Sequence, residues 1–250
     1  MSQHPFIVPA LVDVCHRLAA RGLVTATDGN VSARLPGGNI LATRSGINKG
    51  LVTRNDLVEM TMAGEQVGGS GKPSTEMEMH LYVFRERPDV HAVVHAHPTY
   101  ATGFATARVP LDRCLFPEVV VGMGRIPLAE YATPSTKGVG ESLAPYVHDF
   151  NAILLTNHGA VTYGSDLLQA YFRMEKLEHA AHITFVATML GGAHPLSDKE
   201  LEDLRSVSMQ SYGTAVSPGP VCETSDDHLE VDDTHVRAYI LKALRERGVT

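Results

Sequence analysis

Apolar and polar residues repeat with different periods along the chain, and these periods predict its elements. Between residues 5 and 21, apolar residues recur every three or four positions, which predicts a helix. Short apolar runs at 31–35 and 39–43 flank the turn Pro36-Gly37-Gly38 and predict a hairpin. A further run at 57–62 predicts another strand, and the glycine-rich segment 68–74 predicts a flexible loop.

The middle of the chain predicts alternating helices and strands. Ser74 is placed to cap a helix that runs to about Arg87, where Pro88 and Asp89 follow. The remaining candidates, in chain order, are a strand over 91–98, a helix over 99–108, short strands over 116–121 and 126–129, and a helix over 136–147.

The last hundred residues predict two strands followed by helices. The strands lie within 151–164 and meet at a turn around residues 157–159. A long helix over 166–190 and a helix that starts after Ser197 come next; a loop over 213–233 and a last helix over 234–247 complete the chain. Strands in the middle with helices before and after them predict one three-layer α/β domain.

Composition narrows the possible partners and location. The formal net charge is −7 and no basic stripe is present, which argues against nucleic acid as a partner. No apolar run approaches the roughly 20 residues that cross a bilayer, and the first residues lack the features of a secretory signal. Cys15, Cys114 and Cys222 form no CxxC pair, so we expect reduced thiols. We therefore expect a cytoplasmic protein without a membrane or nucleic-acid partner.

A histidine pair at a strand end is the first candidate for chemistry. His95 and His97 are two residues apart, so on a strand their side chains point to the same face. His158, in the turn Asn157-His158-Gly159, is the obvious third donor, because Gly159 lets a backbone approach closely. Three imidazoles with an open position are typical of a catalytic metal site. The alternative is a pair of hydrogen-bonded histidines at a strand end.

Glu76 is the candidate carboxylate. It follows Lys72-Pro73-Ser74-Thr75 at a predicted helix start, among backbone N–H groups that have no partner within the helix. It is either a residue that favours the helix dipole or a base that removes a C–H proton beside a metal-bound carbonyl. His80, four residues later, lies either near this site or in the core.

Three loops combine small residues with hydroxyls or amides. They are Thr27-Asp28-Gly29-Asn30, Thr43-Arg44-Ser45-Gly46 and Pro73-Ser74-Thr75. A phosphate needs several converging N–H and O–H donors, so together these loops indicate an anion site. The sequence contains neither GxxxxGK[ST] nor a GxGxxG after a strand, and a nucleotide-binding fold has no support.

Five motifs occur in an order that resembles a known family. They are TDGNVSAR, TRSGINKG, KPSTEMEMH, VVHAHP and LTNHGAVTYG. The chain resembles the class II aldolase/adducin family over roughly residues 8–212, and its L-fuculose-1-phosphate aldolase branch most closely. The resemblance implies a three-layer α/β/α sandwich with a central, mostly antiparallel sheet. It also implies a catalytic domain over 1–212, a C-terminal extension over 213–250, and a homotetramer with active sites at subunit interfaces.

The resemblance also assigns roles to particular residues. It implies Zn²⁺ held by His95, His97 and His158, with Mn²⁺ and Co²⁺ as alternatives. Glu76 matches the acid/base glutamate, which also ligates zinc when substrate is absent, and Tyr212 matches a tyrosine lent to the active site. The positions that match the phosphate site are Gly29, Asn30, Ser45, Gly46, Ser74 and Thr75.

The implied activity is that of a metal-dependent aldolase. Its substrate would be a short ketose 1-phosphate, of the L-fuculose or 5-deoxy- or 5-methylthio-pentulose type, and its products dihydroxyacetone phosphate and an aldehyde. One departure keeps a decarboxylase or a pentulose-phosphate epimerase open, because Phe116 stands where the aldolases place a tyrosine acid. A binding module, as in adducin, is disfavoured because all three histidines and Glu76 are present.

Overall fold

An eight-stranded sheet forms the centre of the protein, whose computed structural model describes residues 4–212. The strand order is β4-β3-β2-β1-β5-β8-β7-β6, and every neighbouring pair is antiparallel except β6 with β7. The strands are β1 (Asn30–Arg34), β2 (Ile40–Thr43), β3 (Leu57–Met60), β4 (Gln66–Gly69), β5 (Ala92–Ala96), β6 (Leu128–Ala129), β7 (Ala152–Leu155) and β8 (Gly159–Gly164).

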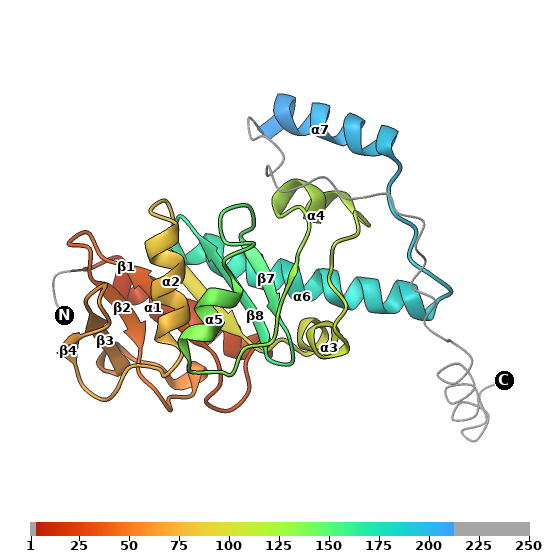
Figure 1. The fold of residues 1–250 in the computed structure, drawn as a ribbon. Helices are drawn as coiled ribbons and strands as arrows, with labels where there is room; N and C mark the ends of the chain where they lie inside the picture. The colour runs from red at the N-terminus through yellow and green to blue at the C-terminus, as the bar shows by residue number, and fades with distance from the viewer. Residues whose placement is uncertain (1–3, 213–250) are drawn as a thin grey trace, which may run out of the picture.

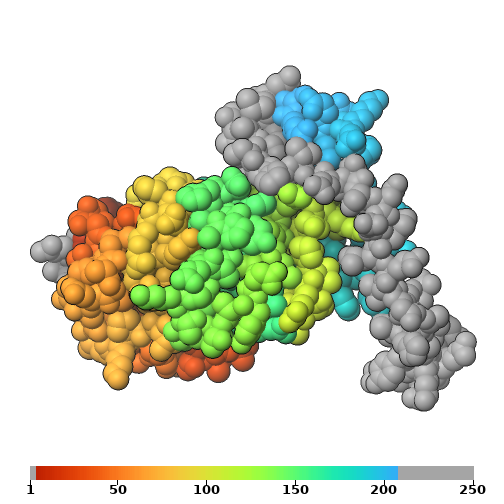
Figure 2. Space-filling view, viewed as in Figure 1, coloured from red at the N-terminus to blue at the C-terminus, as the bar shows by residue number. Residues whose placement is uncertain are grey.

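Helices cover both faces of this sheet (Figure 1). They are α1 (Ile7–Ala20), α2 (Met77–Glu86), α3 (Thr99–Ala107), α4 (Pro117–Gly122), α5 (Lys137–Ser142), α6 (Leu167–Met189) and α7 (Asp198–Tyr212), with short 3₁₀ turns η1 (Lys49–Leu51) and η2 (Arg54–Asp56). The helices α2 and α5 pack together on one face, where Figure 2 shows them side by side. On the other face α6 packs against α1 and α3. The predicted three-layer sandwich is therefore confirmed.

The residues buried on the two faces follow the alternation of the strands. On β5, Val94 packs with the helices α1, α3 and α6, whereas Val93 packs with α2 and α5. Neighbouring residues of a strand point to opposite faces, so each buried strand supplies apolar side chains to both layers. The central strand β5 is buried at all five positions, and this fixes its register firmly.

Most elements predicted from the sequence are present, but the strand predicted over 116–121 is wrong. This segment is the helix α4, with Pro117 at its first position. Proline is well suited to that position because its N–H would have no partner there. Val119 and Val120 are buried, and Val120 packs with Leu201 of α7. Tertiary packing therefore overrides the β preference of the run of valines.

Two further boundaries differ from expectation. The helix α2 begins at Met77 rather than just after Ser74, and Glu76 is its N-cap residue. Ser74 still acts locally, because its Oγ accepts from the Glu76 N–H at 3.3 Å. The segment expected to be a loop over 68–74 contains the end of β4, an edge strand whose residues are mostly exposed. Its polar and glycine-rich sequence gave no apolar period to detect.

Two remaining expectations concern cysteines and membranes. Cys15 is free and buried, but Cys114 is disulfide-bonded, so the prediction of reduced thiols is wrong for Cys114. Within residues 4–212, no helix combines the length and the apolar character that crossing a bilayer requires. The loop and helix expected over 213–247 lie outside the described residues.

Candidate metal centre

Sheet register aims His95 and its neighbours at the face covered by α2. In the antiparallel pairs, His95 lies opposite Asn30 of β1 and opposite Val161 of β8. Residues directly opposite each other share a face of the sheet. Val161 belongs to the core beneath α2, so His95 and Asn30 face that helix as well. Glu76, at the start of α2, therefore sits above the end of β5.

Three imidazoles meet at this point. One ring nitrogen from each of His95, His97 and His158 lies within 4.8 Å of the other two. His95 lies inside β5, His97 follows the strand directly, and His158 comes from the turn between β7 and β8. The side chain of His95 is fully buried and that of His97 is 26% exposed, so the cluster opens to solvent on the His97 side.

The hydrogen bonds of His95 define which of its nitrogens faces the cluster. Its Nδ1 lies 2.9 Å from the carbonyl oxygen of Ala160. A carbonyl only accepts, so Nδ1 carries the proton and the lone pair of the neutral ring is on Nε2. This Nε2 lies 3.0 Å from His97 Nε2 and 3.4 Å from Glu76 Oε2. The backbone of β8 thus orients the ligand atom of β5, as in many metal sites.

Glu76 closes the cluster from above. Its Oε1 lies 2.9 Å from His158 Nε2, and its Oε2 accepts from Asn30 Nδ2 at 2.9 Å. Burial favours a raised pKa for Glu76, but the hydrogen bond from His158 and the nearby rings of His158 and His95 outweigh it and hold the pKa well below its usual range. Glu76 is therefore an ionised carboxylate in this arrangement.

The donor set fits a divalent metal ion. Lone pairs of His95 and Glu76 converge, and such a convergence is stable when a cation lies between the donors. In a tetrahedral zinc site, ligand nitrogens about 2.1 Å from the ion are about 3.4 Å apart, close to the separations described above. His95, His97 and His158 would hold the ion, and Glu76 lies within reach as a fourth ligand. Asp28 Oδ2 lies 3.7 Å from His97 Nδ1, the ring nitrogen that does not face the cluster, and can help to orient the His97 ring.

Gly159 lets the His158 turn reach the end of β5. A Cβ at Gly159 would lie 2.5 Å from the Ala96 carbonyl oxygen and 2.6 Å from His97 Cδ2. Both separations are far shorter than van der Waals contact, so any side chain here would push the two strand ends apart. The close backbone approach inferred from the sequence at Gly159 is confirmed.

The three candidate anion loops adjoin one another and the metal centre. Asn30 Nδ2 donates to Ser74 Oγ at 3.1 Å, which joins the first loop to the third. The Ser45 N–H donates to the Lys72 carbonyl at 2.8 Å, which joins the second loop to the third. Gly29 lies against the backbone of His95, and Gly46 has open space beside it. The structure therefore brings all the sequence-predicted phosphate positions to one region beside Glu76.

Some hydroxyls in these loops are already oriented by neighbours. Ser74 Oγ accepts from Asn30 and from the Glu76 N–H, so its own proton is directed elsewhere. Thr75 Oγ1 accepts from Ser135 Oγ at 2.8 Å, which leaves the Thr75 proton available to an anion. The sequence did not single out Ser135, or Lys49 beneath the loops, because an isolated serine or lysine in a polar loop carries no pattern.

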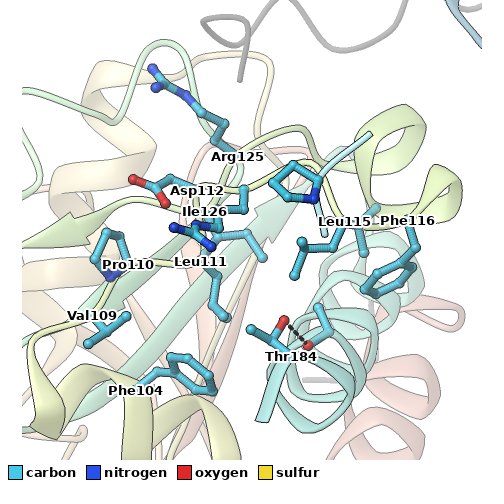
Figure 3. Close-up of a pocket in the computed structure, with 14 residues that line it drawn as sticks. Phe104, Val109, Pro110, Leu111, Asp112, Leu115, Phe116, Arg125, Ile126 and Thr184 are labelled. Atoms are coloured by element: carbon cyan, nitrogen blue, oxygen red, sulfur yellow. Dashed lines mark hydrogen bonds between the residues drawn. The ribbon is translucent and has the colours of Figure 1, made fainter. Parts of the chain in front are cut away.

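Phe116 lies away from the histidine cluster within the described chain. It lines a pocket of about 250 Å³ between α3, α4 and α6, together with Phe104, Leu111, Arg125 and Thr184 (Figure 3). None of the three histidines lines this pocket. Tyr212 is the last residue of α7, and its contribution to an active site stays a prediction.

The fold and the histidine–glutamate cluster define a three-layer α/β/α protein with a candidate divalent-metal site, and comparison with known proteins agrees. The profile described as "Class II Aldolase and Adducin N-terminal domain" matches residues 9–185. The chain therefore belongs to the class II aldolase/adducin family, as the five motifs indicated. Enzymes of this family are metal-dependent.

Relatives in the family carry out more than one reaction. The chain is 38% identical to the 3-oxo-tetronate 4-phosphate decarboxylase of Escherichia coli K12, over 74% of this chain and 89% of the relative. It is 31% identical to an L-fuculose phosphate aldolase of Methanococcus maripaludis, over 72% of this chain and 96% of the relative. Among solved structures, an L-fuculose 1-phosphate aldolase gives a TM-score of 0.74 at 32% identity, covering 80% of this chain and 94% of the other. The structure of YgbL from Escherichia coli, described as a putative aldolase/epimerase/decarboxylase, gives a TM-score of 0.73 at 34% identity and covers 79% of this chain and 96% of the other.

Proposed function

We propose that the protein is a metal-dependent carbon–carbon lyase that decarboxylates a phosphorylated 3-oxo sugar acid, such as 3-oxo-tetronate 4-phosphate. The observation that carries the proposal is the cluster of His95, His97, His158 and Glu76 beside three loops of anion-binding character. The 38% identity to the decarboxylase of Escherichia coli supports this substrate class.

The reaction places specific demands on the site. The bond between C1 and C2 breaks, CO₂ leaves, and the electron pair passes to the C3 carbonyl oxygen. Protonation of C2 then gives dihydroxyacetone phosphate. A divalent ion held by the three histidines would supply positive charge to stabilise the oxygens that become negative. The ion is Zn²⁺ in this proposal, because imidazole donors suit zinc, with Mn²⁺ and Co²⁺ as alternatives.

Glu76 has the position and electrostatics to deliver the proton to C2. Its pKa is held low while His158 donates to it and the ring of His95 lies beside it. When substrate separates the carboxylate from these rings, burial remains and favours the protonated form. Asn30, which donates to Oε2, keeps the carboxyl group aimed at the cluster. The loops that carry Gly29, Asn30, Ser45, Gly46, Ser74 and Thr75 would bind the phosphate and hold C2 near Glu76.

Phe116, which would reach the site from a neighbouring subunit of the proposed tetramer, favours decarboxylation over aldol cleavage. An aldolase must exchange a proton with the oxygen of the departing aldehyde, and the aldolase branch places a tyrosine at this position. Phenylalanine has no proton to exchange, and CO₂ leaves without needing one. Aldol cleavage of a ketose 1-phosphate remains the second candidate, because the aldolase of Methanococcus maripaludis is 31% identical and Glu76 serves either reaction. Tyr212, lent to the active site, would then be the proton donor.

One pair of assays separates the two reactions. Both produce dihydroxyacetone phosphate, so this product measures activity and CO₂ identifies the reaction. We expect the metal-loaded protein to release CO₂ and dihydroxyacetone phosphate in equal amounts from 3-oxo-tetronate 4-phosphate. Dihydroxyacetone phosphate from L-fuculose 1-phosphate, without CO₂ release from the sugar acid, would support the aldolase instead. Inactivity of the metal-loaded protein toward both substrates would contradict the proposed function.

The proposal includes a cytoplasmic homotetramer with active sites between subunits. Large apolar side chains are exposed near both ends of α6, a helix whose other side packs on the sheet, and exposed apolar surface commonly marks a protein interface. They are Leu168, Phe172, Ile183, Phe185, Val186 and Leu190. Light scattering of the purified full-length chain tests this part, and a monomeric mass would contradict it.

A further inference from the structure

A buried lysine lies beneath the anion loops. Lys49 begins the short turn η1, and only 2% of its surface is exposed. Its Nζ donates to the Thr27 carbonyl at 2.8 Å and to the Ile47 carbonyl at 2.7 Å. These two carbonyls belong to the first anion loop and to the residue directly after the second. A single ammonium group therefore joins two of the three loops from below.

The charge of this ammonium group is not neutralised by a carboxylate among the described residues. No ion pair within residues 4–212 includes Lys49. Lysine is rarely buried without such a partner, because removing an ammonium group from water is unfavourable. Burial lowers the pKa of Lys49, while Cys15, Asp28 and Glu76 act in the opposite direction. Two carbonyl dipoles orient the cation but leave its net charge in place.

Hydrogen bonding alone does not account for a lysine here. A neutral donor could join two carbonyls without the cost of burying a charge. The positive charge would stabilise an anion bound above it, because electrostatic attraction in a low-dielectric interior is screened much less than in water. The loops above Lys49 carry the hydroxyls and amides that the proposed function assigns to phosphate.

We propose that Lys49 is a positioning residue whose buried positive charge strengthens phosphate binding in the loops above it. This inference rests on the proposed function, because it requires that the loops bind phosphate. Lys49 acts by holding the two loops at a fixed separation and by supplying a positive field. It is not a Schiff-base lysine, since its Nζ is engaged by two carbonyls in the interior.

Two substitutions separate charge from hydrogen bonding. Lys49→Met removes both, and Lys49→Gln keeps an N–H donor while removing the charge. Lys176→Met is the control, because Lys176 also donates to a backbone carbonyl, that of Glu118, at a site remote from the loops. Inorganic phosphate is titrated by calorimetry into zinc-loaded protein saturated with acetohydroxamate, which occupies the metal so that phosphate reports on the loops alone.

We expect both Lys49 variants to bind phosphate roughly tenfold more weakly than wild type, with acetohydroxamate affinity unchanged. Thermal stability should be largely retained in Lys49→Gln, because its amide N–H can still donate to a carbonyl while the cost of burying a charge is removed. A purely structural lysine would instead lower stability and disturb both ligands together.

Each other result overturns the inference. Wild-type phosphate affinity in Lys49→Gln would show that the charge is not used. Failure of both variants to fold, or a loss of acetohydroxamate binding equal to the loss of phosphate binding, would make Lys49 structural. If wild type itself binds no phosphate under these conditions, the phosphate site of the proposed function fails and the inference fails with it. A loss of phosphate affinity in the Lys49 variants, with wild type and Lys176→Met unaffected, supports both the phosphate site and the role of Lys49.

Discussion

The histidine cluster and the anion loops lie side by side but are held in place by different means. The cluster is built on strand ends: His95 sits inside a fully buried strand, and its register is set by partners on both sides. Asn30 and Thr43 tie the first two loops to β1 and β2, but the other loop residues lie outside these strands. The loops are joined by individual hydrogen bonds, such as Ser45 to Lys72 and Asn30 to Ser74, and by the buried Lys49.

This difference predicts two kinds of response to mutation. A packed sheet has little freedom to relax, so damage at the cluster should be large and cooperative. A loop joined by separate hydrogen bonds loses one contact at a time, so damage there should be graded. The same division suits the proposed chemistry, because metal ligands need fixed geometry whereas an anion site can adapt to the ligand.

Loss of one metal ligand should have the largest effect. We expect His95→Ala to abolish tight zinc binding and to lower kcat by about a thousandfold, because the ion supplies several kcal/mol of charge stabilisation. Metal content by mass spectrometry and turnover by CO₂ release measure the two effects. His182→Ala is the matched control, since His182 stacks on Tyr100 at a centroid distance of 3.9 Å outside the cluster. Zinc bound at full occupancy in His95→Ala would contradict the ligand assignment.

Two glycine substitutions compare the cluster and the loops directly. Gly159→Ala places a Cβ 2.5 Å from the Ala96 carbonyl oxygen, so we expect about 2–3 kcal/mol of destabilisation and metal affinity reduced at least about tenfold. Gly46→Ala meets no atom within 4 Å, but its φ of +70° disfavours a side chain and costs about 1 kcal/mol. Chemical denaturation and zinc titration measure both. Equal effects of the two substitutions would contradict the contrast between rigid and adaptable regions.

The same contrast explains how much could be predicted from the sequence. His95, His97 and Gly159 were predictable because strand geometry alone fixes which residues share a face and where a close approach needs glycine. The helix α1 was predictable because its apolar period is strong, and the hairpin of β1 and β2 was predictable because Pro36-Gly37-Gly38 marks its turn. The segment 116–121 was not, since its valines favour a strand locally and only packing against α7 makes it helical.

The loops were only partly predictable, for a physical reason. Family motifs pointed to Gly29, Asn30 and Ser74, but the contacts between loops depend on tertiary structure. Nothing in the local sequence indicates that Lys49 joins the carbonyls of Thr27 and Ile47, or that Ser135 donates to Thr75. Such contacts have no period and no fixed spacing, so they emerge only from the fold.

We expect the stability of the fold to decrease at acid pH because of His80, a buried histidine near the cluster. His80 lies fully buried beneath the cluster, with Nδ1 2.6 Å from Ser32 Oγ, and burial lowers its pKa to about 3. The unfolded chain binds this proton below about pH 6.5. In the folded protein His80 stays neutral down to about pH 3. The free energy of unfolding therefore falls as the pH decreases from about 6.5 toward 3, by up to about 1.4 kcal/mol per pH unit. Denaturation of wild type and His80→Gln across this range tests the prediction, and equal slopes would contradict it.

The smallest effect is expected where one loop hydroxyl is supported by another. Ser135 is exposed and donates to Thr75 Oγ1 at 2.8 Å, so Ser135→Ala removes a single hydrogen bond. We expect KM for the phosphorylated substrate to rise about two- to threefold with kcat unchanged, because an exposed hydrogen bond contributes little net energy. Ser142→Ala is the control, since its hydroxyl donates to Val139 within α5. A large fall in kcat in Ser135→Ala would mean that the loops, like the cluster, set the geometry of the reacting atoms.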